Sequence, residues 1–210
     1  MNRRSATSLL AGAMLFALSC QVVPLAPNAP PAAPALAQAQ PEPAALPAEA
    51  LAAVRTELEA RRTGLASEEL DALARTIVSE AQHHQLDVAL VMAVMHVESR
   101  FNSFAVSPVG ALGIMQIMPA TGEELAMQHG VRWMGQQTLF DPHVNVKLGV
   151  AYLKKLAERY GNVSTALAAY NWGPGHIDGR LRRGTALPTE YPQLVSDALV
   201  AVRSAPPRRS

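Results

Sequence analysis

The chain has few of the residues that metal and redox sites need. Cys20 is the only cysteine among 210 residues, so disulfides and cysteine-based metal sites are excluded from the rest of the sequence. The six histidines show no metal-ligand spacing. His96-Val97-Glu98 shares the His-x-Glu pattern of zinc deaminases, but the paired cysteines are absent, and residues two apart on a helix point in different directions. We therefore expect no metal and no cofactor.

Excess charge of one sign is also absent. Eighteen Lys and Arg residues stand against seventeen Asp and Glu residues, for a net charge of +1. Nucleic-acid-binding domains usually carry a strong basic excess, so we expect no nucleic-acid partner. The cluster Arg180, Arg182 and Arg183 is interpreted as a solvated basic patch.

The N-terminus has the pattern of an export signal. Basic Arg3 and Arg4 precede the apolar run 9–18, which is shorter than the ~20 residues that span a bilayer. We favour a signal over residues 1–20 with Cys20 as a lipidated first residue; cleavage after Ala37 is the alternative. Either reading predicts an exported, periplasmic protein. A lipid anchor at Cys20, to the outer membrane, would be its only membrane contact.

The rest of the sequence predicts one mainly α domain behind a spacer. Eight of the sixteen prolines lie between residues 24 and 47, which indicates a Pro/Ala-rich tether over 21–47. We expect a peripheral helix within 48–66, the main domain over 67–204 and a flexible tail over 205–210. Apolar spacing and cap signals predict seven helices. Four have both bounds: 49–62, Asp87 (the N-cap) to about Glu98, Pro119 to Gly130, and 163–170. Two have a predicted start only, at the N-cap Ser67 and at Asp141-Pro142, and the last lies within 188–202.

Glu98 is the strongest candidate for a catalytic group. On a helical period it shares a face with Val91, Val94 and Met95, which we expect to be buried. Burial and the negative end of the helix dipole both disfavour a carboxylate, so we predict a raised pKa. An acid that is still protonated near neutral pH can donate its proton to a leaving oxygen. The alternative is a solvated surface residue at a helix end.

Four segments in order carry a family resemblance. They are 96–102 (His-Val-Glu-Ser-Arg-Phe-Asn), 107–121 (Ser-Pro-Val-Gly-Ala-Leu-Gly-Ile-Met-Gln-Ile-Met-Pro-Ala-Thr), Asp141 to Leu153, and 168–175 (Ala-Ala-Tyr-Asn-Trp-Gly-Pro-Gly). Together they resemble the soluble-type lytic transglycosylases, which are relatives of goose-type lysozyme. The resemblance covers roughly residues 70–200. It implies a lysozyme-like α fold, with a small loop or β-hairpin region beside the catalytic helix.

The resemblance also implies a substrate and a site. The substrate would be peptidoglycan, cleaved between N-acetylmuramic acid and N-acetylglucosamine, with Glu98 as the single acid/base. The positions that match substrate-binding residues are Ser107, Gln116, Met118, Tyr170 and Asn171. Structural alternatives stay open: Ser107 could cap a turn, Met118 could be core, and the Tyr170 hydroxyl could hold Glu98, bind a substrate oxygen or be satisfied elsewhere.

The resemblance implies non-hydrolytic cleavage that leaves a 1,6-anhydromuramic acid end. Asp87, Glu123, Glu124 and Asp141 are explained as helix caps or first-turn residues, and no second catalytic carboxylate is evident. One rival is a goose-lysozyme-like muramidase that uses water, and another is a non-catalytic peptidoglycan-binding scaffold. Cell-wall or secretion machinery is an expected partner. Trp172 stands where the family commonly has a small residue, so it either stacks on a sugar or fills space.

Overall fold

The structure is a computed structural model that describes residues 46–61, 63 and 65–204. The predicted export signal, Cys20, almost all of the predicted tether and the tail 205–210 lie outside the described residues. The described residues all belong to one compact unit.

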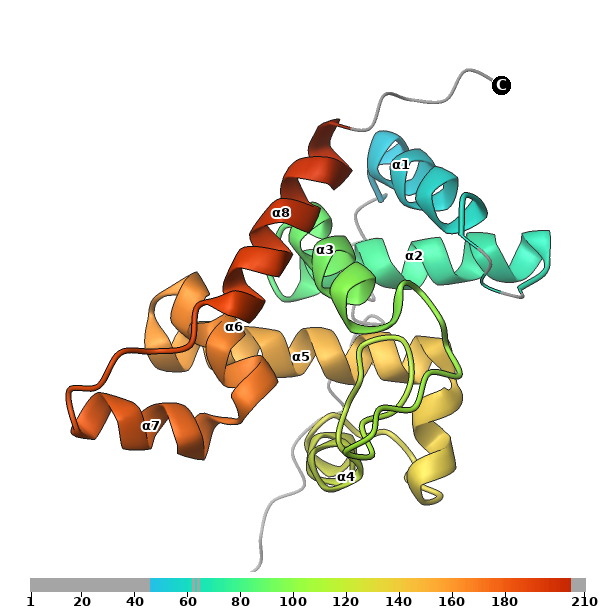
Figure 1. Ribbon diagram of the computed structural model, residues 1–210. Coiled ribbons are helices and arrows are strands. Elements are labelled where there is room, and N and C mark those ends of the chain that lie inside the picture. The colour runs from blue at the N-terminus through green and yellow to red at the C-terminus, as the bar shows by residue number, and fades with distance from the viewer. Residues whose placement is uncertain (1–45, 62, 64, 205–210) are drawn as a thin grey trace, which may run out of the picture. The chain divides into compact units, whose positions relative to one another are not determined.

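The described chain is mainly α, which confirms the predicted fold class (Figure 1). Its helices are α1 (Ala48–Glu59), α2 (Ser67–His83), α3 (Val88–Ser99), α4 (Pro119–Gln128), the 3-10 helix η1 (Gln136–Phe140), α5 (Pro142–Tyr160), α6 (Val163–Trp172), α7 (Pro174–Arg182) and α8 (Glu190–Ser204). None of the helices in this part of the chain is both long and apolar enough to cross a membrane.

Side-chain caps set the starts of α3 and α5, as the sequence predicted. The Asp87 carboxylate accepts from the Ala89 amide at 2.8 Å, and the Asp141 carboxylate accepts from the His143 amide at 2.9 Å. The predicted cap at Ser67 is wrong by one residue. Ala66 holds the N-cap position and its amide donates to the Glu69 carboxylate at 2.7 Å, while Ser67 is already helical.

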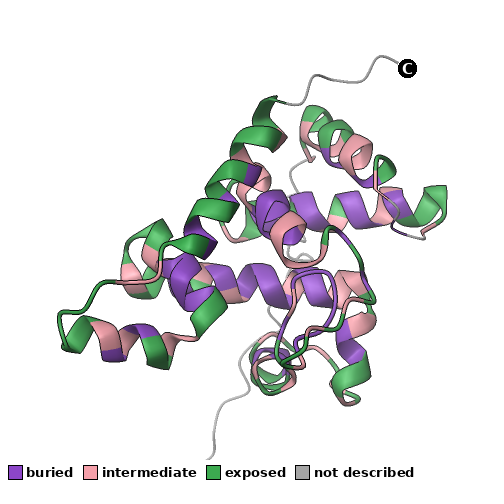
Figure 2. Cartoon of the chain, viewed as in Figure 1, coloured by how far each residue is buried: buried purple, intermediate pink, exposed green. Residues whose placement is uncertain are grey.

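The core forms around α5, which packs against α2, α4, α6 and η1. Figure 2 shows buried residues running along α5 and along the inner faces of α2 and α3. Val146, Leu148, Val150 and Leu153 are almost completely buried on α5. Burial of one such side chain contributes roughly 1.5–3 kcal/mol, so the core fixes α5 as the support on which the neighbouring segments are positioned.

Helix α1 packs on α2 and adds two residues to the same core. Val54 and Leu58 are buried, although charged side chains surround them in the sequence. The guanidinium group of Arg55 pairs with the Asp71 carboxylate and donates to the Ser67 hydroxyl at 2.9 Å. α1 is therefore joined to α2 by both apolar and charged contacts.

The region predicted as a small loop or β-hairpin is a loop with isolated bridges, Val106 with Leu112 and Leu112 with Ile117, and no strand within the described ranges. One helix was missed: none was predicted between 170 and 188, yet Pro174 begins α7. Proline suits a first helical position because no amide donor is needed there.

Candidate active site

The candidate site begins at the C-terminal end of α3. Val91, Val94 and Met95 are fully buried, so the stripe that carries Glu98 faces the core as predicted. Arg100 and Phe101 then adopt positive φ angles of 54° and 68°, which turns the chain sharply away from the helix axis. Such angles cost energy in residues other than glycine, and the complete burial of Phe101 offsets that cost.

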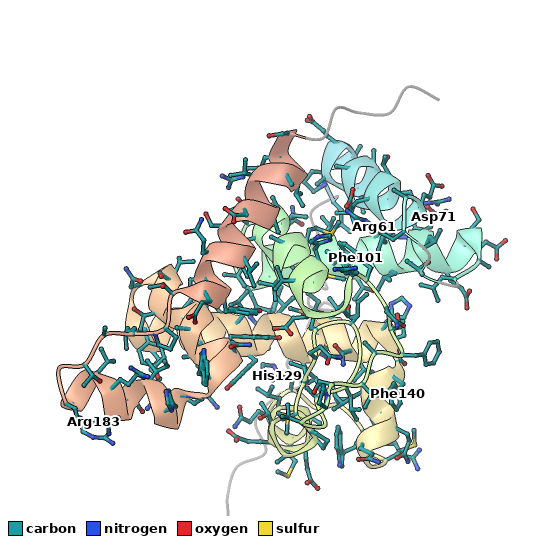
Figure 3. The ribbon with its side chains drawn as sticks, in the orientation of Figure 1. Arg61, Asp71, Phe101, His129, Phe140 and Arg183 are labelled. Atoms are coloured by element: carbon teal, nitrogen blue, oxygen red, sulfur yellow. The ribbon has the colours of Figure 1, made fainter. Side chains whose placement is uncertain are left out.

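A cation covers the Phe101 ring. The Arg61 guanidinium carbon lies 5.6 Å from the ring centroid, and Figure 3 shows these two labelled residues near each other. A cation over an aromatic face adds stabilisation to the buried ring. The turn after Glu98 is thereby fixed, and with it the direction in which the carboxyl group points.

Glu98 is partly buried and accepts one strong hydrogen bond. The Tyr191 hydroxyl donates to Glu98 Oε1 at 2.5 Å. Burial raises the pKa of Glu98 to about 7, while the Tyr191 hydrogen bond acts in the opposite direction by favouring the ionised form. The predicted rise in the pKa is confirmed. Near neutral pH both the protonated and the ionised form are accessible, so the group can both donate and accept a proton.

No second carboxylate of the described residues contributes to this pKa shift. Three acids considered from the sequence have other partners: Asp87 and Asp141 cap helices, and Glu124 pairs with Lys155 at 2.9 Å. Two close carboxyl groups would raise one another's pKa by charge repulsion. Glu98 therefore has the environment of a solitary acid.

Tyr191 was not among the predicted site residues. It lies at the beginning of α8, 93 residues after Glu98 in sequence, and reaches it because α8 packs along α3. Nothing near Glu98 in the sequence indicates this partner. The Tyr170 hydroxyl, which was one candidate for holding Glu98, donates instead to the Met115 carbonyl at 2.9 Å.

Three side chains hold the loop segment Ile114–Met115 in place beside Glu98. The Ser99 hydroxyl donates to the Ile114 carbonyl at 2.7 Å, and Tyr170 donates to the Met115 carbonyl. The buried Asn145 side chain accepts from the Met115 amide at 2.8 Å. These donors and acceptors come from α3, α6 and α5, so the loop is attached to three helices at adjacent residues.

Asn145 also binds two further backbone carbonyl groups. Its amide nitrogen donates to the Leu112 carbonyl at 2.9 Å and to the Leu139 carbonyl at 2.8 Å. Gly113 makes this close approach possible, because a Cβ atom there would lie 2.2 Å from Asn145 Nδ2 and because its φ is +78°. Asn145 belongs to the quoted motif, but the sequence did not identify it as the centre of a buried network.

The predicted substrate-binding residues fall into two groups. Ser107 accepts from the Ala111 amide at 2.9 Å, and Gln116 donates from its amide nitrogen to the Ala105 and Gly113 carbonyls. Both therefore shape the loop itself. Met118 is 42% exposed at the N-cap of α4, and Asn171 is exposed at the end of α6, so both can be reached by a ligand. Tyr170 is buried beneath the loop.

His96 does not join Glu98. Its ring lies 6.1 Å from Phe101, centroid to centroid, whereas Glu98 contacts Tyr191. Burial lowers the pKa of His96, so the ring is neutral at pH 7. Among the described residues there is no group of three or more His, Cys, Asp and Glu side chains that could hold a metal ion.

Replacing Tyr191 with Phe is expected to raise the pKa of Glu98 above 7. The substitution removes the hydrogen bond that favours the carboxylate and leaves burial, which favours the protonated acid. NMR titration of the Glu98 carboxyl carbon measures the change. Tyr160→Phe is the matched control, because the Tyr160 hydroxyl donates to Asp178 instead. An unchanged or lower Glu98 pKa in Tyr191→Phe would contradict the assignment.

Comparisons with known proteins agree on one family. The model for the transglycosylase SLT domain matches residues 75–191, more than half of the chain. A transglycosylase of Enterobacteria phage PRD1 is 40% identical over 98 residues, covering 47% of this chain and 34% of its own. Membrane-bound lytic murein transglycosylase F of Desulfosudis oleivorans is 37% identical over 108 residues, covering 48% of this chain and 22% of its own.

A solved structure shares the fold. The 70 kDa soluble lytic transglycosylase of Escherichia coli superposes with a TM-score of 0.50 at 26% identity, covering 65% of this chain and 24% of that protein. The match supports the lysozyme-like α fold that the sequence resemblance implied. The chain spans about a third or less of the length of the relatives it matches.

Proposed function

Because the chain belongs to the transglycosylase SLT family, we propose that it is a peptidoglycan lytic transglycosylase. It would cleave the β-1,4 bond between N-acetylmuramic acid and N-acetylglucosamine without consuming water. The observation that carries the proposal is the solitary Glu98, whose pKa is raised to about 7 and whose carboxyl group is oriented by Tyr191. A group that titrates near neutral pH can serve first as an acid and then as a base.

In the first step, protonated Glu98 donates its proton to the glycosidic oxygen. The bond from C1 of muramic acid to that oxygen breaks, and N-acetylglucosamine leaves with a new hydroxyl group. The substrate's own N-acetyl group stabilises the cation at C1, as in other substrate-assisted glycosidases. Tyr191 favours the carboxylate that forms, because its hydroxyl donates to the same carboxyl group.

In the second step, the Glu98 carboxylate takes the proton from the 6-hydroxyl of muramic acid. The 6-oxygen then bonds to C1, which gives the 1,6-anhydro sugar and restores protonated Glu98. No proton is lost from the cycle, and no second protein carboxylate is needed. Exposed Met118 and Asn171 would contact the sugar, while Ser107, Gln116 and Tyr170 would act by holding the loop beside it.

A muramidase that uses water is the second candidate function. A direct-displacement hydrolase of that kind uses a second carboxylate to activate water or to attack the sugar. Among the described residues, no second carboxylate contributes to the raised pKa of Glu98, which favours the lyase. A non-catalytic scaffold would not need an acid with a raised pKa, which favours an enzyme over the scaffold.

The test is an analysis of products. The full chain is incubated with purified peptidoglycan, and the released muropeptides are separated and weighed by mass spectrometry. Ends in 1,6-anhydromuramic acid are expected. Reducing ends, heavier by one water, would indicate a muramidase, and the absence of any cleavage would favour the scaffold.

The predicted export signal favours action outside the cytoplasm, where peptidoglycan lies. We propose an exported, periplasmic protein that is either lipidated at Cys20 or free after cleavage behind Ala37. The mass of the mature N-terminus distinguishes the two forms, because an acylated cysteine and a free Gln38 differ greatly in mass. The proposed location is the only basis for proposing cell-wall or secretion machinery as a partner.

A further inference from the structure

Trp172 is a large aromatic side chain that the proposed mechanism does not use. It is the last residue of α6 and 51% of its surface is exposed. Burying a tryptophan is strongly favourable, so an exposed one beside a candidate active site needs an explanation. Trp133, the other tryptophan of the chain, packs against the core.

The Trp172 side chain is held in place by its neighbours. The His176 ring stacks on it with the centroids 5.4 Å apart and the planes 26° apart. Arg180 Nε donates to His176 Nε2 at 3.0 Å, and Arg180 also donates to the Ala186 carbonyl at 2.7 Å. His176 thus covers part of the indole, while about half of the Trp172 surface stays exposed.

The turn between α6 and α7 creates this stack. Gly173 has φ of 81° and ψ of 143°, a conformation that residues with a side chain rarely adopt. Pro174 starts α7 directly afterwards, which places His176 against Trp172 across the corner. Figure 1 shows α7 leading away from the end of α6. The aromatic pair is therefore a product of a specific backbone turn and not of a mobile loop.

The location connects the pair to Glu98. Trp172 follows Tyr170 by two residues, and Tyr170 both bonds the Met115 carbonyl and is close enough to Glu98 for that charge to raise the Tyr170 pKa. Asn171, between them, is exposed. The backbone of Trp172 is therefore two residues from a side chain that is close to Glu98, while the indole, unlike the Tyr170 ring, faces solvent.

Charge on α7 favours an anionic strand. Arg182 is exposed at the end of α7 and Arg183 follows it, while the one acid of this helix, Asp178, already pairs with Arg159 and accepts from Tyr160. Peptidoglycan carries carboxylates on its peptide stems, or on the lactyl group where no stem is attached. The positive end of α7 would attract a strand that carries such groups.

We propose that Trp172, supported by His176, is a stacking platform for a saccharide ring of the peptidoglycan strand beyond the bond that Glu98 cleaves. The inference rests on the proposed function for its substrate, but it concerns binding and not the chemical step. The apolar face of a sugar lies flat on an indole ring, and a ring that is already immobilised loses little entropy on binding.

Binding is measured with the Glu98→Gln variant of the full chain, which is not expected to cleave, and the pentamer of N-acetylglucosamine as the probe. Adding Trp172→Ala is expected to weaken binding about tenfold by calorimetry. Trp172→Phe should retain part of the affinity, and His176→Ala should cause a smaller loss than Trp172→Ala. Met127→Ala is the control, because Met127 is 74% exposed on α4 and lies outside the proposed platform.

Fluorescence assigns the contact to one residue. With only two tryptophans in the chain, the pentamer should change the emission in Trp133→Phe and leave it unchanged in Trp172→Phe. In the active enzyme, Trp172→Ala should raise KM for peptidoglycan with little change in kcat. Unaltered affinity in Trp172→Ala, a signal that comes from Trp133, or no binding of the pentamer would each overturn the inference. Product analysis of the wild type tests the proposed function separately.

Discussion

Glu98→Gln is expected to lower the rate of peptidoglycan cleavage at least about 1,000-fold. General acid–base catalysis contributes roughly 10² to 10⁴ per group, and Glu98 serves in both steps of the proposed reaction. Glutamine has nearly the same shape and keeps an oxygen that can accept from Tyr191, but it has no proton to give. The release of anhydromuropeptides over time measures the loss.

The same variant should be more stable than the wild type at alkaline pH. The Glu98 pKa is raised from 4.5 to about 7 in the folded chain, so the folded state binds more protons than the unfolded state between these values. Stability from this group is complete below pH 4.5 and is lost as the pH rises through 7. At pH 8 the gain in Glu98→Gln is about 3 kcal/mol, measured by urea unfolding, and it vanishes near pH 4.

Glu123→Gln is the matched control for both effects. Glu123 is exposed on α4, so its replacement should change neither the rate nor the pH dependence of stability noticeably. Retention of more than about a tenth of the activity by Glu98→Gln would sink the assignment of Glu98 as the acid/base. Loss of activity together with loss of folded protein would not support it either, because a folding defect explains both.

Elements with local causes could be predicted from the sequence. Asp87 and Asp141 cap helices through amides two residues ahead, so the whole signal lies within one turn. The start of α2 was predicted one residue too late. The Glu69 carboxylate accepts from the Ala66 amide, so Ala66 can occupy the N-cap position without a polar side chain. α7 was missed because Gly173 and Pro174 end one helix and begin the next without an intervening loop.

In the candidate site, too, the residues that could be predicted are those with a local sequence pattern. Glu98 could be identified from the apolar stripe of its own helix and from the family motif. Its partner Tyr191 could not, because the contact depends on how α8 packs on α3 and has no local pattern. Nor could the sequence show that Ser107 and Gln116 satisfy the loop backbone, since that depends on the turn which brings Ala105, Ala111 and Gly113 near them.

Asn145→Ala is expected to destabilise the protein by about 4 kcal/mol. The Asn145 side chain is completely buried and satisfies the Met115 amide and the Leu112 and Leu139 carbonyls. Alanine would leave the Met115 amide and the Leu139 carbonyl unpaired, each at a cost of roughly 1–3 kcal/mol, whereas the Leu112 carbonyl still accepts from the Ile117 amide at 3.0 Å. Urea unfolding at neutral pH measures the change.

Asn162→Ala provides the matched control. Asn162 is an exposed N-cap of α6 whose side chain accepts from the Thr165 amide at 2.9 Å, so its loss should cost only about 1 kcal/mol. Because Asn145 holds Met115 beside the Tyr170 hydroxyl, Asn145→Ala should also reduce activity under conditions where the variant is still folded, whereas Asn162→Ala should not. Similar stabilities for the two variants would show that the buried amide is not the anchor of this loop. A folded Asn145→Ala with full activity would show that the loop can be positioned without it.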